Sequence, residues 1–169
     1  MFGRVRQTIL AATAYLRPVG DERARAYLSD TEYELYMQMK RSDRQHHLRL
    51  LGYLLKRNHS HPALLTAALL HDVGKSTVSF SILDRILAVV VNQLWPAKFK
   101  AWSTGEPTGW KTPFVASANH PRWGAELLTA AGGDEAAVAL VRHHQDKIGA
   151  VPPHLRELLS LLKEADNRS

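Results

Sequence analysis

An unbroken apolar segment that ends in a histidine and an aspartate constrains this chain more than any other feature. Residues 63–70 read ALLTAALL, and HDVGK follows at 71–75. Pro62 suits the first turn of a helix, where its missing N–H is not needed. A helix with almost no polar face belongs at the centre of a domain. Because a buried imidazole and a buried carboxylate need partners, His71 and Asp72 are candidate metal ligands.

Helical signals recur along the rest of the chain, and no segment alternates as a strand would. A capping box at 29–32 opens one helix, Asn119 precedes another, and Asp134 can cap a third. Residues 98–113 read as a loop rich in Gly, Pro, Trp and Lys. The sequence therefore predicts an all-α protein, with helices over 5–16, 30–40, 45–57, 62–72, 78–94, 120–131, 135–144 and 154–166.

Composition narrows the chemistry that the chain can support. The sequence has no cysteine, which excludes disulfides, thiolate metal sites and a cysteine nucleophile. Its nine histidines leave imidazole and carboxylate as the ligands for a transition metal. The formal charge of +6 favours anionic partners, although it can also serve solubility alone. The apolar stretches are short and the N-terminus is a poor signal peptide, so we expect a cytoplasmic protein.

The residues around the His-Asp pair suit phosphoryl chemistry. The carboxylate of Asp72 has two oxygens and can therefore bridge two ions, which one imidazole nitrogen cannot. Lys75 lies four residues after His71 and three after Asp72, so its ammonium group can reach the same place and hold a phosphoryl oxygen. Alternatively, Lys75 only places a positive charge at the end of the helix.

Further motifs follow in a fixed order, and together they resemble a known family. They are HHLR at 46–49, HDVGK at 71–75, HPRWG at 120–124, the histidine pair at 143–144 and Asp166. This order is similar to that of the HD superfamily of metal-dependent phosphohydrolases, and most of all to its HD-GYP branch. The resemblance runs from about Asp43 to Asp166. It implies a single domain over 1–169, with N-terminal helices at 1–42, an HD core at 43–166 and a basic, aromatic insertion at about 94–114.

The resemblance also implies a site for two divalent transition-metal ions, of iron, manganese, nickel or zinc. Asp72 would bridge the ions as a catalytic residue, and Lys75 and Arg49 would bind the substrate. A hydroxide held between two ions forms near neutral pH and would attack phosphorus. His47 stays an alternative to His46, although the H-x-x-R spacing favours His46. The implied metal ligands are His46, His71, Asp72, His120, His143, His144 and Asp166.

Two departures from the family pattern bear on function. QDK follows the histidine pair, in place of the Gly-Tyr-Pro run of the HD-GYP branch. Ser42 and Asp43 stand where some members carry a glutamate for a third metal, so we expect two ions. The predicted function is hydrolysis of a phosphomonoester or phosphodiester, with a nucleotide implied by the resemblance alone. The alternatives are a regulatory HD domain that binds metal or nucleotide, and a cyclic-dinucleotide phosphodiesterase without Gly-Tyr-Pro.

The insertion at about 94–114 interleaves aromatic and basic residues and permits three interpretations. Its tryptophans can pack on the domain, or the segment can form a lid over the metal site. It can also make weak contact with a membrane surface through Trp95, Phe99 and Trp102. No groove-reading motif supports a specific nucleic-acid partner.

Overall fold

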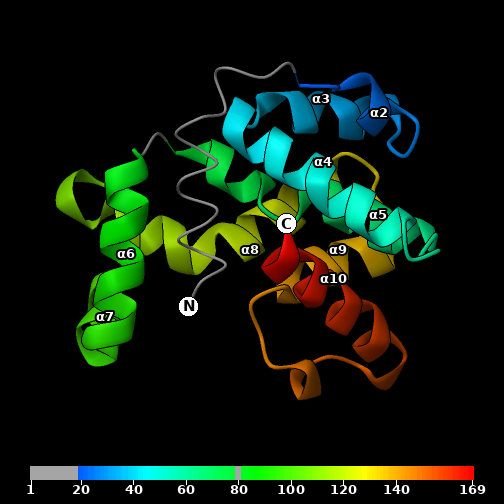
Figure 1. Cartoon of the computed structure of the whole chain (residues 1–169). Coiled ribbons are helices and arrows are strands. Elements are labelled where there is room, and N and C mark those ends of the chain that lie inside the picture. The colour runs from blue at the N-terminus through cyan, green and yellow to red at the C-terminus, as the bar shows by residue number, and fades with distance from the viewer. Residues whose placement is uncertain (1–18, 79–80) are drawn as a thin grey trace.

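The computed structural model describes residues 19–78 and 81–169, and in these residues it is all-α, as the sequence predicts. The expected helix over 5–16 lies outside the described residues. Figure 1 shows the helices gathered into a main body, with α6 and α7 to one side of it. The helices are α2 (Glu22–Arg25), α3 (Asp30–Gln38), α4 (Arg41–Leu55), α5 (Pro62–Leu70), α6 (Ile82–Leu94), α7 (Pro96–Trp102), α8 (Thr112–Ala130), α9 (Glu135–His143) and α10 (Arg156–Arg168).

The apolar helix α5 lies at the centre of the body. Every residue from 63 to 70 is buried, and Pro62 occupies the first turn as predicted. Helices α3, α4, α9 and α10 pack around α5, and a short 3-10 helix over Val73–Thr77 follows it and packs on α8. Because α5 is covered from several sides, the residues at its C-terminal end face the middle of the body.

Local capping explains where several helices begin. Ser29 accepts a hydrogen bond from the backbone N–H of Glu32, whose carboxylate accepts one from Ser29 in return. The predicted capping box is therefore confirmed. Asp134 caps α9 as predicted, since its carboxylate accepts from two backbone N–H groups. A second capping box, between Ser81 and Asp84, opens α6 at Ile82 rather than at the predicted Val78.

The prediction of a loop over 98–113 was wrong in part, because α7 fills 96–102. Helix α8 also begins at Thr112, well before the predicted start at His120. Asn119 does not cap a helix there: its side-chain amide donates to the carbonyl oxygens of Val115 and Ser103 instead. Pro121, which suits a first turn, lies inside α8.

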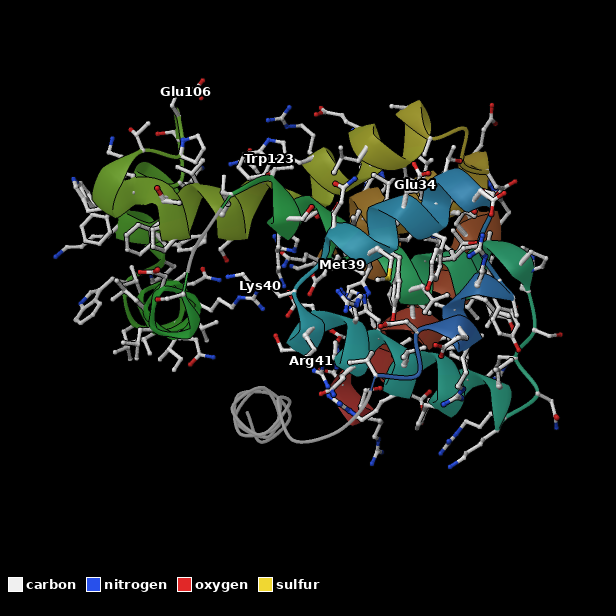
Figure 2. All side chains as sticks on the ribbon, turned by 90° about the horizontal axis from the view of Figure 1, so that it is seen from above. Glu34, Met39, Lys40, Arg41, Glu106 and Trp123 are labelled. Carbon is white, nitrogen blue, oxygen red and sulfur yellow. The ribbon has the colours of Figure 1, made fainter. Side chains whose placement is uncertain are left out.

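Helices α6 and α7 and the start of α8 share a small apolar core of their own. Ala88, Val91 and Phe114 are buried, and Phe99 and Trp102 pack against them. The tryptophan ring of Trp102 lies 5.2 Å from that of Phe114, centroid to centroid. We call α6 and α7 the helical arm, and Figure 2 shows it beside the body from above. No helix in the described part of the chain is long and apolar enough to span a membrane.

Candidate metal centre

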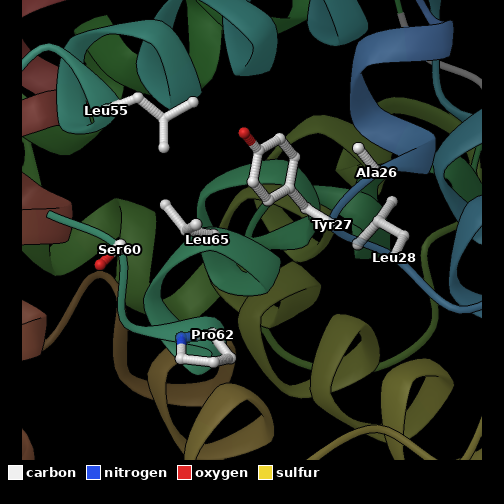
Figure 3. A pocket seen from close by; sticks show the side chains of 7 residues that line it. All are labelled: Ala26, Tyr27, Leu28, Leu55, Ser60, Pro62 and Leu65. Carbon is white, nitrogen blue, oxygen red and sulfur yellow. The ribbon is translucent and has the colours of Figure 1, made fainter. Parts of the chain in front are cut away.

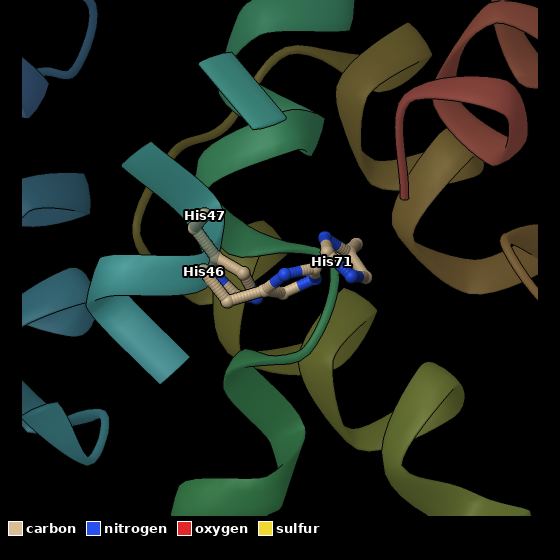
Figure 4. A group of neighbouring side chains, drawn as sticks. All are labelled: His46, His47 and His71. Carbon is tan, nitrogen blue, oxygen red and sulfur yellow. The ribbon is translucent and has the colours of Figure 1, made fainter. Parts of the chain in front are cut away.

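Five segments that are far apart in the sequence meet at the end of α5. His46 and His47 come from α4, and His71 and Asp72 directly follow α5. Figure 4 shows the three histidines of α4 and α5 close together. The remaining members are His120 on α8, His144 at the end of α9 and Asp166 on α10.

The first group of possible ligands consists of His46, His47 and His71, each with a ring nitrogen within 4.8 Å of the others. Asp166 lies beside them, because its Oδ1 is 2.9 Å from His46 Nε2 and 3.9 Å from His71 Nε2. Asp72 Oδ2 is 3.8 Å from His71 Nε2 and 4.0 Å from His47 Nε2. We call these five residues cluster 1.

The second group lies on the other side of Asp72 and consists of Asp72, His120 and His144. Asp72 Oδ1 is 3.1 Å from His120 Nε2 and 3.6 Å from His144 Nε2. The two Nε2 atoms are 3.2 Å apart. We call this group cluster 2. The two oxygens of one carboxylate thus face two different sets of imidazoles.

Backbone carbonyls fix how three of these imidazoles present their nitrogens. His47 donates from Nδ1–H to the carbonyl oxygen of Leu69 at 2.7 Å. In the same way, His120 donates to Ala116 at 3.1 Å, and His144 donates to Val141 at 2.7 Å. A carbonyl can only accept, so Nδ1 must carry the hydrogen. In the neutral ring, Nε2 then offers a lone pair toward the carboxylates, which is how metal-binding histidines are usually held.

This arrangement brings lone pairs together with no hydrogen between them. In cluster 2, Asp72 Oδ1 and the Nε2 atoms of His120 and His144 are all acceptors within 3.6 Å of one another. In cluster 1, His47 Nε2 faces Asp72 and is buried without a hydrogen-bond partner among the described residues. A buried acceptor without a partner costs about 1–3 kcal/mol. A divalent cation satisfies such groups, so the donor set fits a transition metal of the kind that imidazole prefers.

Electrostatics puts the ligands in the protonation states that a cation requires. Burial lowers the pKa of His71 to about 4, and the charge of Asp72 only partly offsets this effect. Burial also lowers the pKa values of His120 and His144. Burial opposes ionisation of Asp72, but the ammonium group of Lys75 and the neighbouring histidines hold its pKa well below the usual range. At neutral pH the imidazoles of His71, His120 and His144 are therefore neutral and Asp72 is charged, as metal ligands must be.

The structure does not bring His143 together with the other predicted ligands. Its Nδ1 lies 2.7 Å from a carboxylate oxygen of Asp146, and its side chain is 30% exposed. Neighbouring residues at a helix end point about 100° apart, and here the inward position belongs to His144. His143 is therefore absent from both clusters.

The two residues predicted to bind substrate lie on different elements, Lys75 on the 3-10 helix after α5 and Arg49 on α4. The ammonium group of Lys75 hydrogen-bonds Oδ2 of Asp72, and its side chain is partly open to solvent. It is therefore close enough to contact a ligand bound at Asp72. Arg49 lies one turn after His46 on α4 and is half-buried.

Sequence reasoning missed two residues that support cluster 2. Lys163 donates from its ammonium group to the carbonyl oxygens of His144, at 2.9 Å, and Asp146, at 2.8 Å. It thereby holds the segment after α9 in place. The side-chain amide of Gln145 lies 3.3 Å from His120 Nε2. Lys163 precedes Asp166 by three residues on α10, so helical spacing places both toward the same side.

A close backbone approach joins the loop after Asp72 to the helix that carries His120. A Cβ atom at Gly74 would collide with the carbonyl oxygen of His120 and would lie 2.6 Å from the backbone nitrogen of Gly124. Only glycine fits at position 74, and this contact sets the spacing between Asp72 and His120.

A surface pocket lies apart from both clusters (Figure 3). It is formed where the chain after α2 meets the turn between α4 and α5. No residue that lines it belongs to cluster 1 or cluster 2, and the lining is mostly apolar: Ala26, Tyr27, Leu28, Leu55, Ser60, Pro62 and Leu65.

The histidine and aspartate residues of the two clusters, in their order along an all-α chain, indicate the class of protein. The family model of the HD domain matches residues 44–169, and the chain belongs to this family. HD domains are generally metal-dependent phosphohydrolases, and the two clusters are groups that could hold metal. No match was found among curated proteins or solved structures.

Proposed function

We propose that this chain is a metal-dependent phosphohydrolase that acts on a phosphomonoester or phosphodiester, with a nucleotide-like compound as the substrate. The observation that carries the proposal is the position of Asp72, whose two carboxylate oxygens face two separate sets of imidazole nitrogens. A carboxylate in this position suits a pair of ions better than a single one.

The proposed ligand set follows the two clusters and differs from the sequence prediction in two places. His143 is left out because it pairs with Asp146, and His47 is added because its buried Nε2 faces Asp72 and has no hydrogen-bond partner within residues 19–78 and 81–169. The proposed ligands of the first ion are His46, His47, His71, Asp72 and Asp166, and those of the second are Asp72, His120 and His144.

Divalent ions at these positions would supply an activated water and would polarise the phosphoryl oxygens. The chain itself contributes positioning and charge. Lys75 contacts Asp72 and is partly exposed, so its ammonium group can hold a non-bridging phosphoryl oxygen and stabilise the charge that develops there. The Asp166 side chain is 39% exposed, which leaves cluster 1 accessible to a small ligand.

The test combines metal analysis with a substrate panel. The protein is purified without chelator, its bound metals are measured, and release of phosphate or nucleotide is assayed on nucleotides, cyclic dinucleotides and aryl phosphates with added manganese. Asp72→Asn should lose metal and activity together. Lys75→Met should keep the metal and lose at least about tenfold in kcat/KM, since it removes one charge-assisted contact.

Asp30→Asn is a matched control, because Asp30 is exposed, pairs with Arg25 and belongs to neither cluster. It should behave as the wild type does. Bound metal without turnover on any phosphate ester would reject the hydrolase and favour a regulatory HD domain. Selective turnover of cyclic dinucleotides would identify a phosphodiesterase without the Gly-Tyr-Pro motif.

A further inference from the structure

The outer face of α6 carries an apolar stripe that no described part of the chain covers. Its side chains are well exposed, from 39% at Ile86 and Val90 to 75% at Leu83. At 100° per residue, all of them fall within one arc of about 100° around the helix. We call them the α6 stripe: Leu83, Ile86, Leu87, Val90 and Leu94.

The opposite side of α6 already has its partners. Ala88 and Val91 are buried against Phe114, and Arg85 forms an ion pair with Asp43 on α4. The α6 stripe is therefore not needed for packing of the helical arm. Five large apolar side chains on one exposed helix face are more than scattered surface residues, and a patch of this kind marks an interaction site.

The surroundings of the stripe indicate what kind of surface it meets. Trp95 follows Leu94 directly and is 50% exposed, and the ammonium group of Lys98 lies 5.8 Å from the centre of its ring. Lys100 is exposed on the same short helix α7. An apolar stripe that ends in tryptophan and lysine is typical of helices that lie in the interface of a membrane.

The charges near the stripe fit an anionic surface and fit a second copy of this chain poorly. Asp84 is the single acidic residue within 82–102. Its carboxylate accepts hydrogen bonds from the backbone and the hydroxyl of Ser81. An antiparallel copy of α6 would offer one carboxylate, already hydrogen-bonded through Oδ2, to the two lysines of α7, whereas anionic lipid headgroups would offer a negative charge to each lysine.

We propose that the helical arm docks on an anionic lipid surface through the α6 stripe, Trp95 and the lysines of α7. The proposed surface differs in one respect from the contact expected from the sequence. Phe99 and Trp102 pack inside the arm, so the proposed contact surface is the α6 stripe together with Trp95. The proposal is independent of the metal centre.

The experiment is vesicle flotation of the full chain with neutral phosphatidylcholine vesicles and with vesicles that also contain phosphatidylglycerol. The wild type should float with the anionic vesicles and lose binding as salt is raised. Leu87→Glu with Leu94→Glu should weaken binding by at least about tenfold, because each leucine loses its apolar contact. Lys98→Gln with Lys100→Gln should weaken it by roughly fivefold per lysine.

Met37→Glu is the matched control, because Met37 is similarly exposed, at 42%, but lies on α3. It should float as the wild type does, and unchanged thermal melting of all variants shows that they fold. Absence of wild-type flotation, or equal binding to neutral and anionic vesicles, overturns the proposal. Sedimentation velocity decides between a lipid surface and a second copy of the chain. If the wild type does not bind vesicles but forms a dimer that Leu87→Glu dissociates, the α6 stripe binds a second copy.

Discussion

Arg85 donates two hydrogen bonds to Asp43, from Nη1 to Oδ1 at 2.7 Å and from Nη2 to Oδ2 at 2.8 Å. This pair joins α6 to the helix that carries His46. Both carboxylate oxygens of Asp43 are engaged in this pair. Burial opposes ionisation of Asp43, but the hydrogen bonds and charge of Arg85 keep its pKa below the usual value.

Removing one partner of this pair should destabilise the protein. Arg85→Ala leaves the carboxylate of Asp43 buried without its partner, which should lower the free energy of unfolding by about 3 kcal/mol. Urea denaturation followed by circular dichroism measures this change. Arg122→Ala is the control, since Arg122 pairs with Glu126 where both side chains are about half exposed, and it should cost no more than about 1 kcal/mol. Equal losses in the two variants would show that the Asp43–Arg85 pair is not structural.

Gly74→Ala should be strongly destabilising, because its Cβ would meet the carbonyl oxygen of His120. The loop and α8 would have to separate, and we expect a loss of at least about 3 kcal/mol in unfolding free energy. Gly149→Ala provides the comparison, since its Cβ would meet no atom within 4 Å. That substitution should change stability by about 0.5 kcal/mol or less. Similar thermal melting of the two variants would refute the close approach at Gly74.

His47→Ala should reduce metal affinity without abolishing the fold. If the lone pair of His47 Nε2 binds the first ion, loss of this ligand should lower the affinity for that ion by about 10–100-fold. Isothermal titration with cobalt, with the visible absorption of bound cobalt as a second readout, measures the change. His61→Ala alters an exposed histidine and should leave both signals unchanged. Unaltered cobalt affinity in His47→Ala would show that His47 only fills space.

The metal-free protein should lose stability as the pH falls from about 6.5 toward 4. An unfolded histidine takes up a proton near pH 6.5, whereas buried His71 stays neutral down to about 4. Between these values the unfolded chain binds more protons than the folded chain does. The free energy of unfolding therefore falls as the pH is lowered, by roughly 3 kcal/mol for His71 alone.

The depressed pKa of Asp72 extends the acid sensitivity below pH 4, since its contribution is present above the unfolded value and is lost in acid. Chelator-treated protein, unfolded by urea over a pH series, tests both effects. His71→Asn should reduce the slope between pH 4 and 6.5 and leave the part that buried His120 and His144 contribute. A wild-type profile without any slope in that range would contradict the burial of a neutral His71.

Much of the fold could be predicted because its causes are local. The apolar run of α5 requires a central position, and the capping residues Ser29 and Asp134 fix helix starts through contacts within three residues. Helix α7 was missed because it has seven residues and no side-chain cap. Its stability comes from Phe99 and Trp102 packing on distant Phe114, which the sequence does not reveal.

The candidate site was predictable as a set of residues but not as a geometry. Motif order indicated His71, Asp72 and His120, and the structure brings them together. Motif order could not decide which of the neighbours His46 and His47 faces the site, because that depends on a contact with another helix. The carbonyl oxygen of Leu69 on α5 holds the His47 ring inward, so both histidines of α4 face the centre.

The first and last members of cluster 1, His46 and Asp166, are 120 residues apart in the sequence yet touch in the folded chain. An unfolded chain must close that long loop before the two side chains can meet, so the proposed metal site would form only after folding. Ions that bind the native state alone then add to its stability in proportion to the logarithm of their concentration. The supply of metal in the surroundings would thus set how long each newly made chain persists against unfolding and proteolysis.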